Sequence, residues 1–470
     1  LRAQGAMTNE LIEQRVGLLL DNGETGFART ITRRLPPERA SRLIERADFI
    51  DRPAPTLDAW LASPERSADI AAVRDGFAQL ARVAPDAALD RFAAVAARAG
   101  SEAEAAELSL GLALGLAWDR RSEALDYFAR VPEPALDDTA RAWQARAAMW
   151  AGDWELVAAV IAAMSEPVRA QVAWRYWAAR AAAGRGLQAD AEAEYGAILD
   201  TDNYYSAMAA TRLGKRVEPR QMPFPPDAAA IDAIAMRAPF QRARELSLVG
   251  LRNLATVEWQ YGYAELPEDA RPQAIHLAAR WELYDVAVAT ATSFGIFNDY
   301  ELLYPRPYHD EIVAAVKLTD VDRALLYGML RQESLFRPDV ASPAGALGVA
   351  QLSYTTARAT AQRWQLPVPK RTDLFDADVG ITLGAAHLAD LLVQFDAELP
   401  AALGAYNAGD AAAARWLPPK PIDSDVWIEN IPYDETRAYV RRVLWHSLVF
   451  AWLETGRAQH PRSWLEKIGK

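Results

Sequence analysis

One glutamate stands on an otherwise apolar face of a predicted helix. In and beside the stretch "YGMLRQESLFRPDVASPAGALGVAQLS", which runs from Tyr327 to Ser353, helical spacing puts Leu326, Met329 and Glu333 on the same side. A carboxyl group on a buried face loses the hydration of its charged form, so its pKa rises and it can hold a proton near neutral pH. A general acid needs this property, which makes Glu333 the first candidate catalytic residue.

The ordinary alternative is an ion pair at the end of a helix. Arg331 and Arg337 lie two residues before and four residues after Glu333 and could neutralise it. For an isolated glutamate this interpretation would be preferred. The segments that follow Glu333 therefore decide between the two.

A loop of small residues comes directly after the predicted helix. In "SPAGALGVAQ", Ser342 and Gln351 stand at the two ends. Between them, Gly345 and Gly348 would allow backbone amides to come close to a ligand. The loop is a candidate wall of a binding site.

Two later segments carry aromatic and polar side chains of the kinds that bind sugars. They are Tyr406 and Asn407 in "GAYNAG" (404–409), and Glu435, Arg437 and Tyr439 in "WIENIPYDETRAYVRRVL" (427–444). An aromatic ring offers an apolar face with a polar tip, and the amides and carboxylates offer hydrogen bonds. Together with Glu333 they suggest a saccharide site.

Four motifs, in this order and spacing, give the segment a family resemblance. They are "RQES" (331–334), "SPAGALGVAQ" (342–351), "AYNAG" (405–409) and "IPYDETRAYV" (431–440). They resemble the lysozyme-like domain of soluble lytic murein transglycosylases, bacterial enzymes that cleave the glycan strands of peptidoglycan. The resemblance is strongest over about 305–450. The helical front half also resembles the ring-forming helical domain and linker domain of that family.

The resemblance implies a reaction with one carboxylate. Glu333 would protonate the glycosidic oxygen between N-acetylmuramic acid and N-acetylglucosamine, and the acetamido group of the substrate would stabilise the cation. Ionised Glu333 would then take the proton of the 6-hydroxyl, which closes to a 1,6-anhydromuramoyl end. The resemblance also implies that certain residues contact the substrate. These are Ser342, Gly348, Gln351, Tyr406, Asn407, Glu435 and Tyr439.

Other functions stay open at this point. Most glycosidases use two carboxylates; Asp339 is expected to cap or solvate a turn, which leaves Glu435 as the competitor for a second role. A goose-type lysozyme-like hydrolase would differ only in whether water reaches the intermediate. A non-catalytic helical-repeat scaffold is a third class, because such repeats bind partners.

Three positions depart from the family pattern. Ser353 stands where the family has a methionine that lines a sugar subsite, so the fit of the substrate is in question there. Gly380 and His387 replace an asparagine and a tyrosine, and both are expected to have structural roles. The five histidines include no pair at i and i+4, so neither a metal nor a cofactor is expected.

Helices must position these residues, because the sequence has almost no strand signals. Its 470 residues exceed one domain. Helical periodicity continues to about residue 215, and Trp143 recurs as Trp177 with an offset of 34, the period of a helical-hairpin repeat. A plain helical bundle is the alternative. The helix that carries Glu333 is expected to start at Thr319 as its cap, with Asp322 completing a capping box.

Proline-rich breaks divide the chain. Four prolines fall within 217–226, and "YPRPYHD" occupies 304–310. The predicted fold is all-α: a superhelical solenoid followed by a lysozyme-like, mainly α catalytic domain. The predicted domains are a helical repeat domain (1–215), a helical linker domain (216–304) and a catalytic domain (305–470).

Composition narrows the partners and the location. A net charge of −12 without a Lys/Arg run argues against nucleic acid. The apolar run Leu108–Trp118 is too short to cross a bilayer and predicts a buried helix. The absence of cysteine suits a cytosolic and an extracytoplasmic protein equally. The sequence starts at Leu1 rather than Met, so we expect that a signal peptide has been removed, and the family resemblance implies a periplasmic location. Its expected partners are peptidoglycan strands and, through the helical domain, other cell-wall enzymes.

Overall fold

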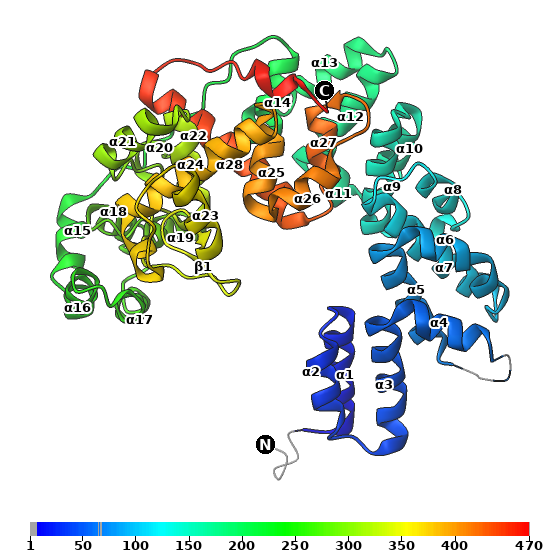
Figure 1. Cartoon of the computed structure of the whole chain (residues 1–470). Helices are drawn as coiled ribbons and strands as arrows, with labels where there is room; N and C mark the ends of the chain where they lie inside the picture. Colours follow the sequence, from blue (N-terminus) through cyan, green and yellow to red (C-terminus); the bar gives the residue numbers. More distant parts are fainter. Residues whose placement is uncertain (1–6, 64, 66–67, 470) are drawn as a thin grey trace. The chain divides into compact units, whose positions relative to one another are not determined.

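The structure is a computed structural model (Figure 1) that describes residues 7–63, 65 and 68–469. Regular structure in this part is almost entirely helical, which confirms the predicted all-α class. The chain divides into two compact units: unit 1 is Leu1–Glu194 with Glu429–Pro432, and unit 2 is Tyr195–Ile428 with Tyr433–Lys470. The division into three domains stays a prediction.

Unit 1 consists of helices that follow one another with short turns. They are α1 (Asn9–Asp21), α2 (Thr25–Thr32), α3 (Pro37–Asp51), α4 (Pro53–Leu61), α5 (Ile70–Val83), α6 (Pro85–Ala97), α7 (Glu102–Trp118), α8 (Ala124–Phe128), α9 (Asp138–Ala151), α10 (Trp154–Ala162), α11 (Glu166–Arg169), α12 (Val172–Gly184) and α13 (Gln188–Gly196), with a 3₁₀ turn η1 (Glu133–Ala135). Proline opens several of them at the first helical position, where a missing N–H costs nothing.

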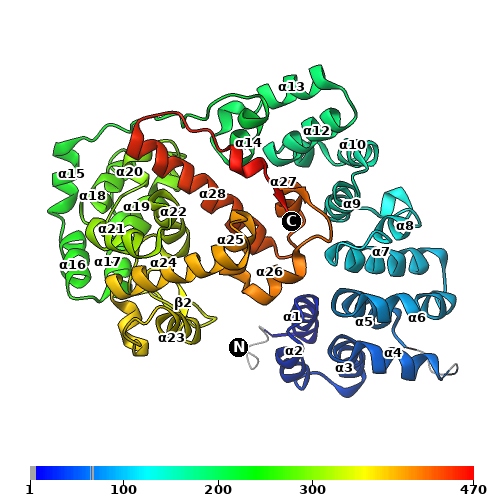
Figure 2. The ribbon, with the colours of Figure 1, turned by 45° about the horizontal axis from the view of Figure 1, so that its top comes forward.

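The helices of unit 1 stack in the manner of a helical repeat. Helix α5 packs between α3 and α7, α7 packs on α9, and α4 packs on α6 in a second layer (Figure 2). The predicted buried helix is α7, and its Gly115 lies so close to α5 that a Cβ atom would come within 2.4 Å of the Ala81 carbonyl. The repeated tryptophans Trp143 and Trp177 are both buried, on α9 and α12.

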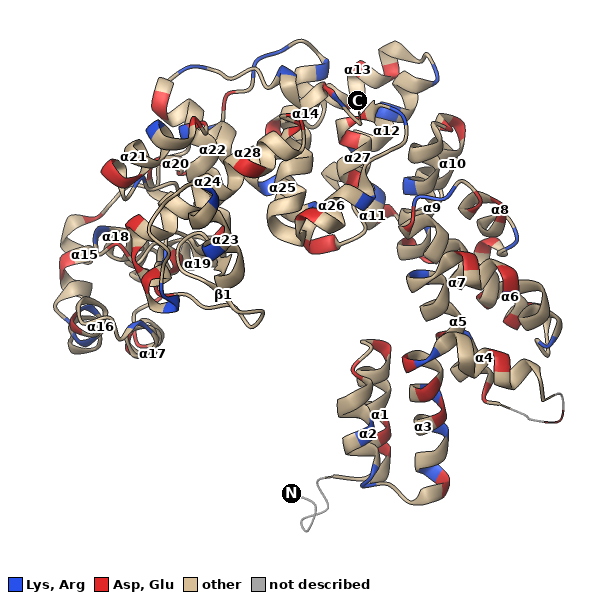
Figure 3. Cartoon of the chain, viewed as in Figure 1, with Lys and Arg blue, Asp and Glu red and all other residues tan. Residues whose placement is uncertain are grey.

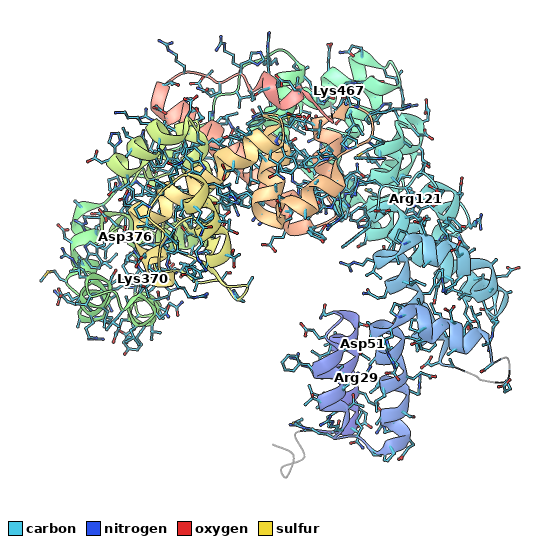
Figure 4. All side chains as sticks on the ribbon, viewed as in Figure 1. Arg29, Asp51, Arg121, Lys370, Asp376 and Lys467 are labelled. Carbon is cyan, nitrogen blue, oxygen red and sulfur yellow. The ribbon has the colours of Figure 1, made fainter. Side chains whose placement is uncertain are left out.

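Ion pairs cross-link neighbouring helices of unit 1. The Arg29 guanidinium on α2 lies 2.7 Å from the Asp51 carboxylate at the end of α3 (Figure 4). Inside the same unit, the buried Glu429 carboxylate accepts hydrogen bonds from Arg146 Nη2 (2.9 Å) and Trp177 Nε1 (3.1 Å). Acidic and basic side chains are interspersed along these helices (Figure 3), as expected for a solvated surface.

Unit 2 contains the remaining helices and the strands. The helices are α14 (Tyr204–Arg212), α15 (Ala228–Ala235), α16 (Ala238–Leu248), α17 (Arg252–Ala264), α18 (Ala274–Arg280), α19 (Tyr284–Ser293), α20 (Tyr300–Leu303), α21 (His309–Thr319), α22 (Arg323–Ser334), α23 (Tyr354–Arg363), α24 (Ala377–Gln394), α25 (Leu399–Ala408), α26 (Asp410–Trp416), α27 (Ser424–Glu429) and α28 (Asp434–Thr455). The 3₁₀ turns are η2 (Leu199–Thr201), η3 (Arg271–Gln273), η4 (Arg371–Phe375) and η5 (Arg462–Leu465). The strands are β1 (Ala346–Leu347), β2 (Leu352–Ser353), β3 (Ile422–Asp423) and β4 (Lys467–Ile468), paired antiparallel as β1–β2 and β3–β4.

The core of unit 2 forms where α22 packs along α28, and α24 packs on α21 and α25. The proline-rich segment after α14 is mostly irregular, because each proline lacks an N–H donor and restricts the residue before it. No helix in the described part of the chain is both long and apolar enough to span a bilayer.

The predicted start of the helix that carries Glu333 is wrong. Thr319 is the last residue of α21, and its hydroxyl donates to the Ala315 carbonyl at 2.8 Å. The N-cap of α22 is Asp322, whose carboxylate accepts from the Leu325 amide at 2.8 Å. Asp and Thr are both good caps, but Thr319 still belongs to α21, whose C-cap is Asp320 with φ 58°, so Asp322 caps α22.

Candidate active site

Glu333 lies in the last turn of α22, one residue before the helix ends. Leu326 and Met329 on the same face are fully buried, whereas the Glu333 side chain is partly exposed at the end of that face. The predicted apolar face therefore leads to a carboxyl that is surrounded by protein and still accessible. A helix C-terminus carries partial negative charge, which further disfavours a carboxylate there.

The ion-pair interpretation of Glu333 is wrong. The Arg331 guanidinium donates to the Leu303 carbonyl (3.2 and 3.3 Å), contacts His446 Nε2 at 3.1 Å and lies over the Tyr304 ring. Arg337 pairs with Asp285 and Asp339. Both neighbouring cations have other partners, so neither holds Glu333 in its charged form.

Glu333 is hydrogen-bonded to Tyr439 on α28, whose hydroxyl donates to Glu333 Oε1 at 2.7 Å. Burial raises the pKa of Glu333 to about 8, with a further increase from the Glu435 charge, while the Tyr439 hydrogen bond acts in the opposite direction. Burial also raises the pKa of Tyr439 well above its usual value, so Tyr439 stays a donor. A carboxyl with this pKa can donate a proton near neutral pH and accept one afterwards.

The loop 342–351 forms most of a short β-hairpin, and hydrogen bonds within the loop stabilise its turn. Strands β1 and β2 pair Leu347 with Leu352, and the four residues between them form the turn. Gly348 has φ 73°, and a Cβ atom there would lie 1.8 Å from the Leu374 carbonyl oxygen, so only glycine fits. Gln351 also has a left-handed backbone, at φ 46°. Its side-chain Nε2 donates to the Val340 carbonyl at 3.2 Å and to the Gly348 carbonyl at 2.7 Å.

The predicted substrate contacts at the two ends of this loop have internal partners. Ser342 Oγ accepts from the Ala346 amide at 3.0 Å and closes the turn before β1. Gln351 fixes the loop backbone as described above. Both side chains shape the loop, and their contact with a ligand stays a prediction.

Tyr406 on α25 joins the loop to the helices behind it. Its hydroxyl donates to the Ala350 carbonyl at 2.9 Å, and burial raises its pKa well above the usual value, with the Glu333 charge as the second cause. Gly384 on α24 makes room for this contact, since a Cβ there would lie 2.6 Å from the Ala350 Cβ. The His387 ring lies 5.3 Å from the Tyr406 ring, centroid to centroid. Burial lowers the pKa of His387 to about 4.

Asn407 is oriented by Thr436, which the sequence motifs did not mark as a site residue. The buried Thr436 donates from Oγ1 to Asn407 Oδ1 at 2.6 Å, which leaves the NH₂ group of the amide as the donating end. In sequence, Thr436 lies between the predicted site residues Glu435 and Tyr439. Its side chain is buried against Asn407, a contact that a threonine in the sequence does not indicate. The side chain of Glu435 is exposed, and that of Asp339 pairs with Arg337 as an exposed turn residue.

The departures from the family pattern have local explanations. Ser353 is the N-cap of α23, where its Oγ accepts from the Thr356 amide at 3.0 Å. Gly380 faces Val349, whose Cγ1 would lie 3.0 Å from an added Cβ, which supports a structural role. His387 packs within α24, as expected, but its Nδ1 has no hydrogen-bond partner among the described residues.

The structure thus brings together Glu333, Tyr439, Tyr406 and the turn 348–351, with Glu435 close enough to affect the pKa of Glu333. Arg437, a further polar candidate, is buried and contacts Asp434. No group of three or more His, Asp or Glu side chains that could hold a metal ion occurs within the described residues. One carboxyl with a raised pKa, hydrogen-bonded to a tyrosine, can donate a proton and accept one in turn.

The chain is similar in sequence to known proteins. Residues 311–422 match the family model "Transglycosylase SLT domain". The chain is 29% identical over 274 residues to the soluble lytic murein transglycosylase of Salmonella typhimurium, a match that covers 58% of this chain and 42% of that protein. It is 27% identical over 303 residues to that of Escherichia coli K12, covering 64% and 46%. The chain spans about half the length of these curated relatives.

Solved structures show the same fold. The chain aligns over its full length with 77% of an inactive glutamate-to-glutamine mutant of lytic transglycosylase Slt from Pseudomonas aeruginosa, at 26% identity and a TM-score of 0.85. The 70 kDa soluble lytic transglycosylase of Escherichia coli aligns with a TM-score of 0.81 at 23% identity, over 98% of this chain and 75% of that one. The chain is thus similar in sequence and in fold to soluble lytic murein transglycosylases, and residues 311–422 match their SLT domain.

Proposed function

We propose that the protein is a lytic transglycosylase that cleaves the β-1,4 bond between N-acetylmuramic acid and N-acetylglucosamine in peptidoglycan. The observation that carries the proposal is the lone carboxyl of Glu333, which is free of any ion pair with Arg331 or Arg337 and hydrogen-bonded to Tyr439. The names of the relatives support the substrate class.

In the first step, protonated Glu333 donates its proton to the glycosidic oxygen as the C–O bond breaks. A pKa of about 8 keeps most of the carboxyl protonated at neutral pH, so the acid is ready before the substrate binds. The acetamido group of the muramoyl residue stabilises the positive charge at its own anomeric carbon. This neighbouring group replaces the second carboxylate of an ordinary retaining glycosidase.

In the second step, ionised Glu333 accepts the proton of the muramoyl 6-hydroxyl while that oxygen bonds to the anomeric carbon. The product is a 1,6-anhydromuramoyl end, and Glu333 is again protonated. The Tyr439 hydroxyl donates to Glu333 Oε1 and favours the carboxylate during this exchange. No water enters the balance of the reaction.

Tyr406, Asn407 and the turn that contains Gly348 and Gln351 are proposed to bind the glycan. Thr436 occupies Asn407 Oδ1, so the amide NH₂ is the part of Asn407 that can donate to a sugar oxygen. The exposed carboxylate of Glu435 is proposed to interact with the substrate without giving or taking a proton. We expect the reaction to take place in the periplasm, where peptidoglycan lies.

The masses of the products test the proposal. Digestion of purified peptidoglycan should release fragments one water lighter than those of a muramidase, and the Glu333→Gln variant should fold and release none. Reducing-end products would indicate the goose-type hydrolase instead. Absence of cleavage by the wild-type protein on every glycan would favour the helical scaffold. Cleavage by Glu333→Gln would move the acid elsewhere, with Glu435 the first residue to test.

A further inference from the structure

The backbone two and three residues after Glu333 adopts an uncommon conformation. Helix α22 ends at Ser334, and both following residues are left-handed: Leu335 at φ 51° and Phe336 at φ 64°. A helix often ends with one left-handed residue, usually glycine. Two in succession, neither of them glycine, are unfavourable, and such residues persist only where the surrounding structure holds them.

Phe336 is held by aromatic rings and by a hydrogen bond to its backbone. Its side chain is 2% exposed, and the rings of Tyr284, Tyr327 and Phe450 meet it edge-on with centroids 6.1–6.3 Å away. Its carbonyl accepts from the Tyr308 hydroxyl at 3.1 Å. Tyr308 is itself left-handed, at φ 57°, at the start of α21. The side chain therefore cannot turn away, and its carbonyl has a fixed partner.

The next residue, Arg337, is held by an ion pair with Asp285. Arg337 Nη1 lies 3.2 Å from Asp285 Oδ2 in the first turn of α19, and the other oxygen of Asp285 lies 3.4 Å from Arg252 Nη1. These side chains are about one quarter exposed, so solvent screens the pairs only in part. Two contacts to residues well before α22 in sequence thus hold the segment three and four residues after Glu333.

We propose that Tyr308 and Asp285 are positioning residues, which keep Glu333 in its reactive orientation by holding Phe336 and Arg337. The inference rests on the proposed role of Glu333. The last turn of a helix opens readily when its end is free, because its carbonyl groups lack partners within the helix. Glu333 lies in that turn, so its side chain keeps a fixed direction only while the segment after it is held.

The test compares two tyrosine-to-phenylalanine variants of the full chain. Tyr308→Phe removes the hydrogen bond to Phe336, and the matched control Tyr300→Phe removes a buried hydroxyl that donates to Asp202 at 2.9 Å, in another part of unit 2. We expect Tyr308→Phe to lower kcat by about tenfold, with KM within about twofold of the wild type, since a small misplacement of a catalytic group mainly affects the chemical step. Tyr300→Phe should lower thermal stability without lowering kcat.

Asp285→Asn provides a second variant, which keeps the size of the side chain and removes the pairing charge. It should show the same loss of kcat at unchanged KM. Hydrogen exchange of the peptide 331–337 gives a readout that does not need turnover: its amides include Leu335 N, bonded to the Arg331 carbonyl at 3.0 Å. We expect exchange there to be at least about tenfold faster in Tyr308→Phe than in Tyr300→Phe.

The outcomes separate the two proposals. If the wild type cleaves peptidoglycan and Tyr308→Phe matches Tyr300→Phe in kcat and in exchange, the positioning role is wrong and the proposed function stands. If the wild type does not cleave peptidoglycan, the proposed function fails, and equal exchange in the two variants would then also overturn the positioning role.

Discussion

The Tyr439 hydroxyl donates to Glu333 Oε1 across 2.7 Å, and joins the last turn of α22 to α28. The hydrogen bond favours the carboxylate, whereas burial favours the carboxylic acid, and burial has the larger effect on the pKa. Near neutral pH Glu333 can therefore exist as the acid or as the carboxylate, the two forms that the proposed reaction requires.

Removal of the Tyr439 hydroxyl should disturb this balance. In Tyr439→Phe the pKa of Glu333 should rise above about 8, because the group that stabilises the carboxylate is lost. We expect the alkaline limit of kcat to move to higher pH and kcat at pH 7 to fall about tenfold, the cost of one hydrogen bond to a charged group. A pH–rate profile measures both. An unchanged alkaline limit would mean that this hydrogen bond does not control the titration.

The charge of Glu435 should have a smaller effect of the opposite sign. Its carboxylate raises the pKa of Glu333, so Glu435→Gln should lower that pKa and move the alkaline limit of kcat to lower pH. Since the side chain is exposed, solvent screens the interaction, and we expect kcat at pH 7 to stay within about threefold of the wild type. Loss of all activity would instead give Glu435 a catalytic role.

Stability should depend on pH through Glu333. Its pKa is about 8 in the folded protein and near 4.5 when unfolded, so the unfolded chain releases the proton first and stability falls as the pH rises from 4.5 to 8. Glu333→Gln cannot ionise and should be more stable than the wild type at pH 9, by an amount of the order of 4 kcal/mol if burial is maintained. The two proteins should be similar at pH 4. Urea unfolding at both pH values measures this difference.

Two glycines of the loop provide a matched pair. Gly348→Ala would place a Cβ atom 1.8 Å from the Leu374 carbonyl oxygen and should destabilise the fold by about 3–5 kcal/mol. Gly345 has a similar φ of 87° and no atom within 4 Å of an added Cβ, so Gly345→Ala should cost only about 1 kcal/mol. Thermal unfolding of the two variants separates the steric clash at Gly348 from the cost of a left-handed alanine. Equal losses of stability would show that the contact with Leu374 can relax.

The hydroxyl of Thr436 should matter for binding. In Thr436→Val, Asn407 Oδ1 loses its donor at 2.6 Å and the amide can turn over, which removes the NH₂ group from its place. We expect KM to rise about fivefold with kcat unchanged, since an interaction made equally in the bound and transition states is lost. Thr436→Ser keeps the hydroxyl and serves as the control. A loss of kcat instead would place Asn407 nearer to the reacting atoms.

The sequence predicted the helical class and the raised pKa of the Glu333 carboxyl, because both depend on local patterns: helical periodicity, and a carboxyl on an apolar face. It did not predict the N-cap of α22, because Thr319 and Asp322 are both good caps and the local sequence does not show that α21 continues to Thr319. It also could not predict the partners of Glu333, since Tyr439 lies 106 residues away in the chain. Such contacts depend on how α22 and α28 pack.

For Ser342 and Gln351, too, the sequence did not show which groups their side chains would contact. Their polarity and their place beside glycines suggested ligand contacts, yet the Ser342 hydroxyl accepts from the Ala346 amide and the Gln351 amide donates to two carbonyls of the loop. A polar side chain in a tight loop satisfies its own backbone as readily as a substrate, and sequence alone does not separate the two uses.

The β1–β2 hairpin makes the number of residues in its turn a fixed quantity. Ala346 pairs with Ser353 and Leu347 with Leu352, so loss or gain of one residue in between would move Leu352 to the exposed side and Ser353 to the buried one. That shift would also remove the cap of α23. An engineered variant of the chain could thus accept new residue types in part of this turn, whereas a change in the length of the turn would disturb both the loop and the start of α23.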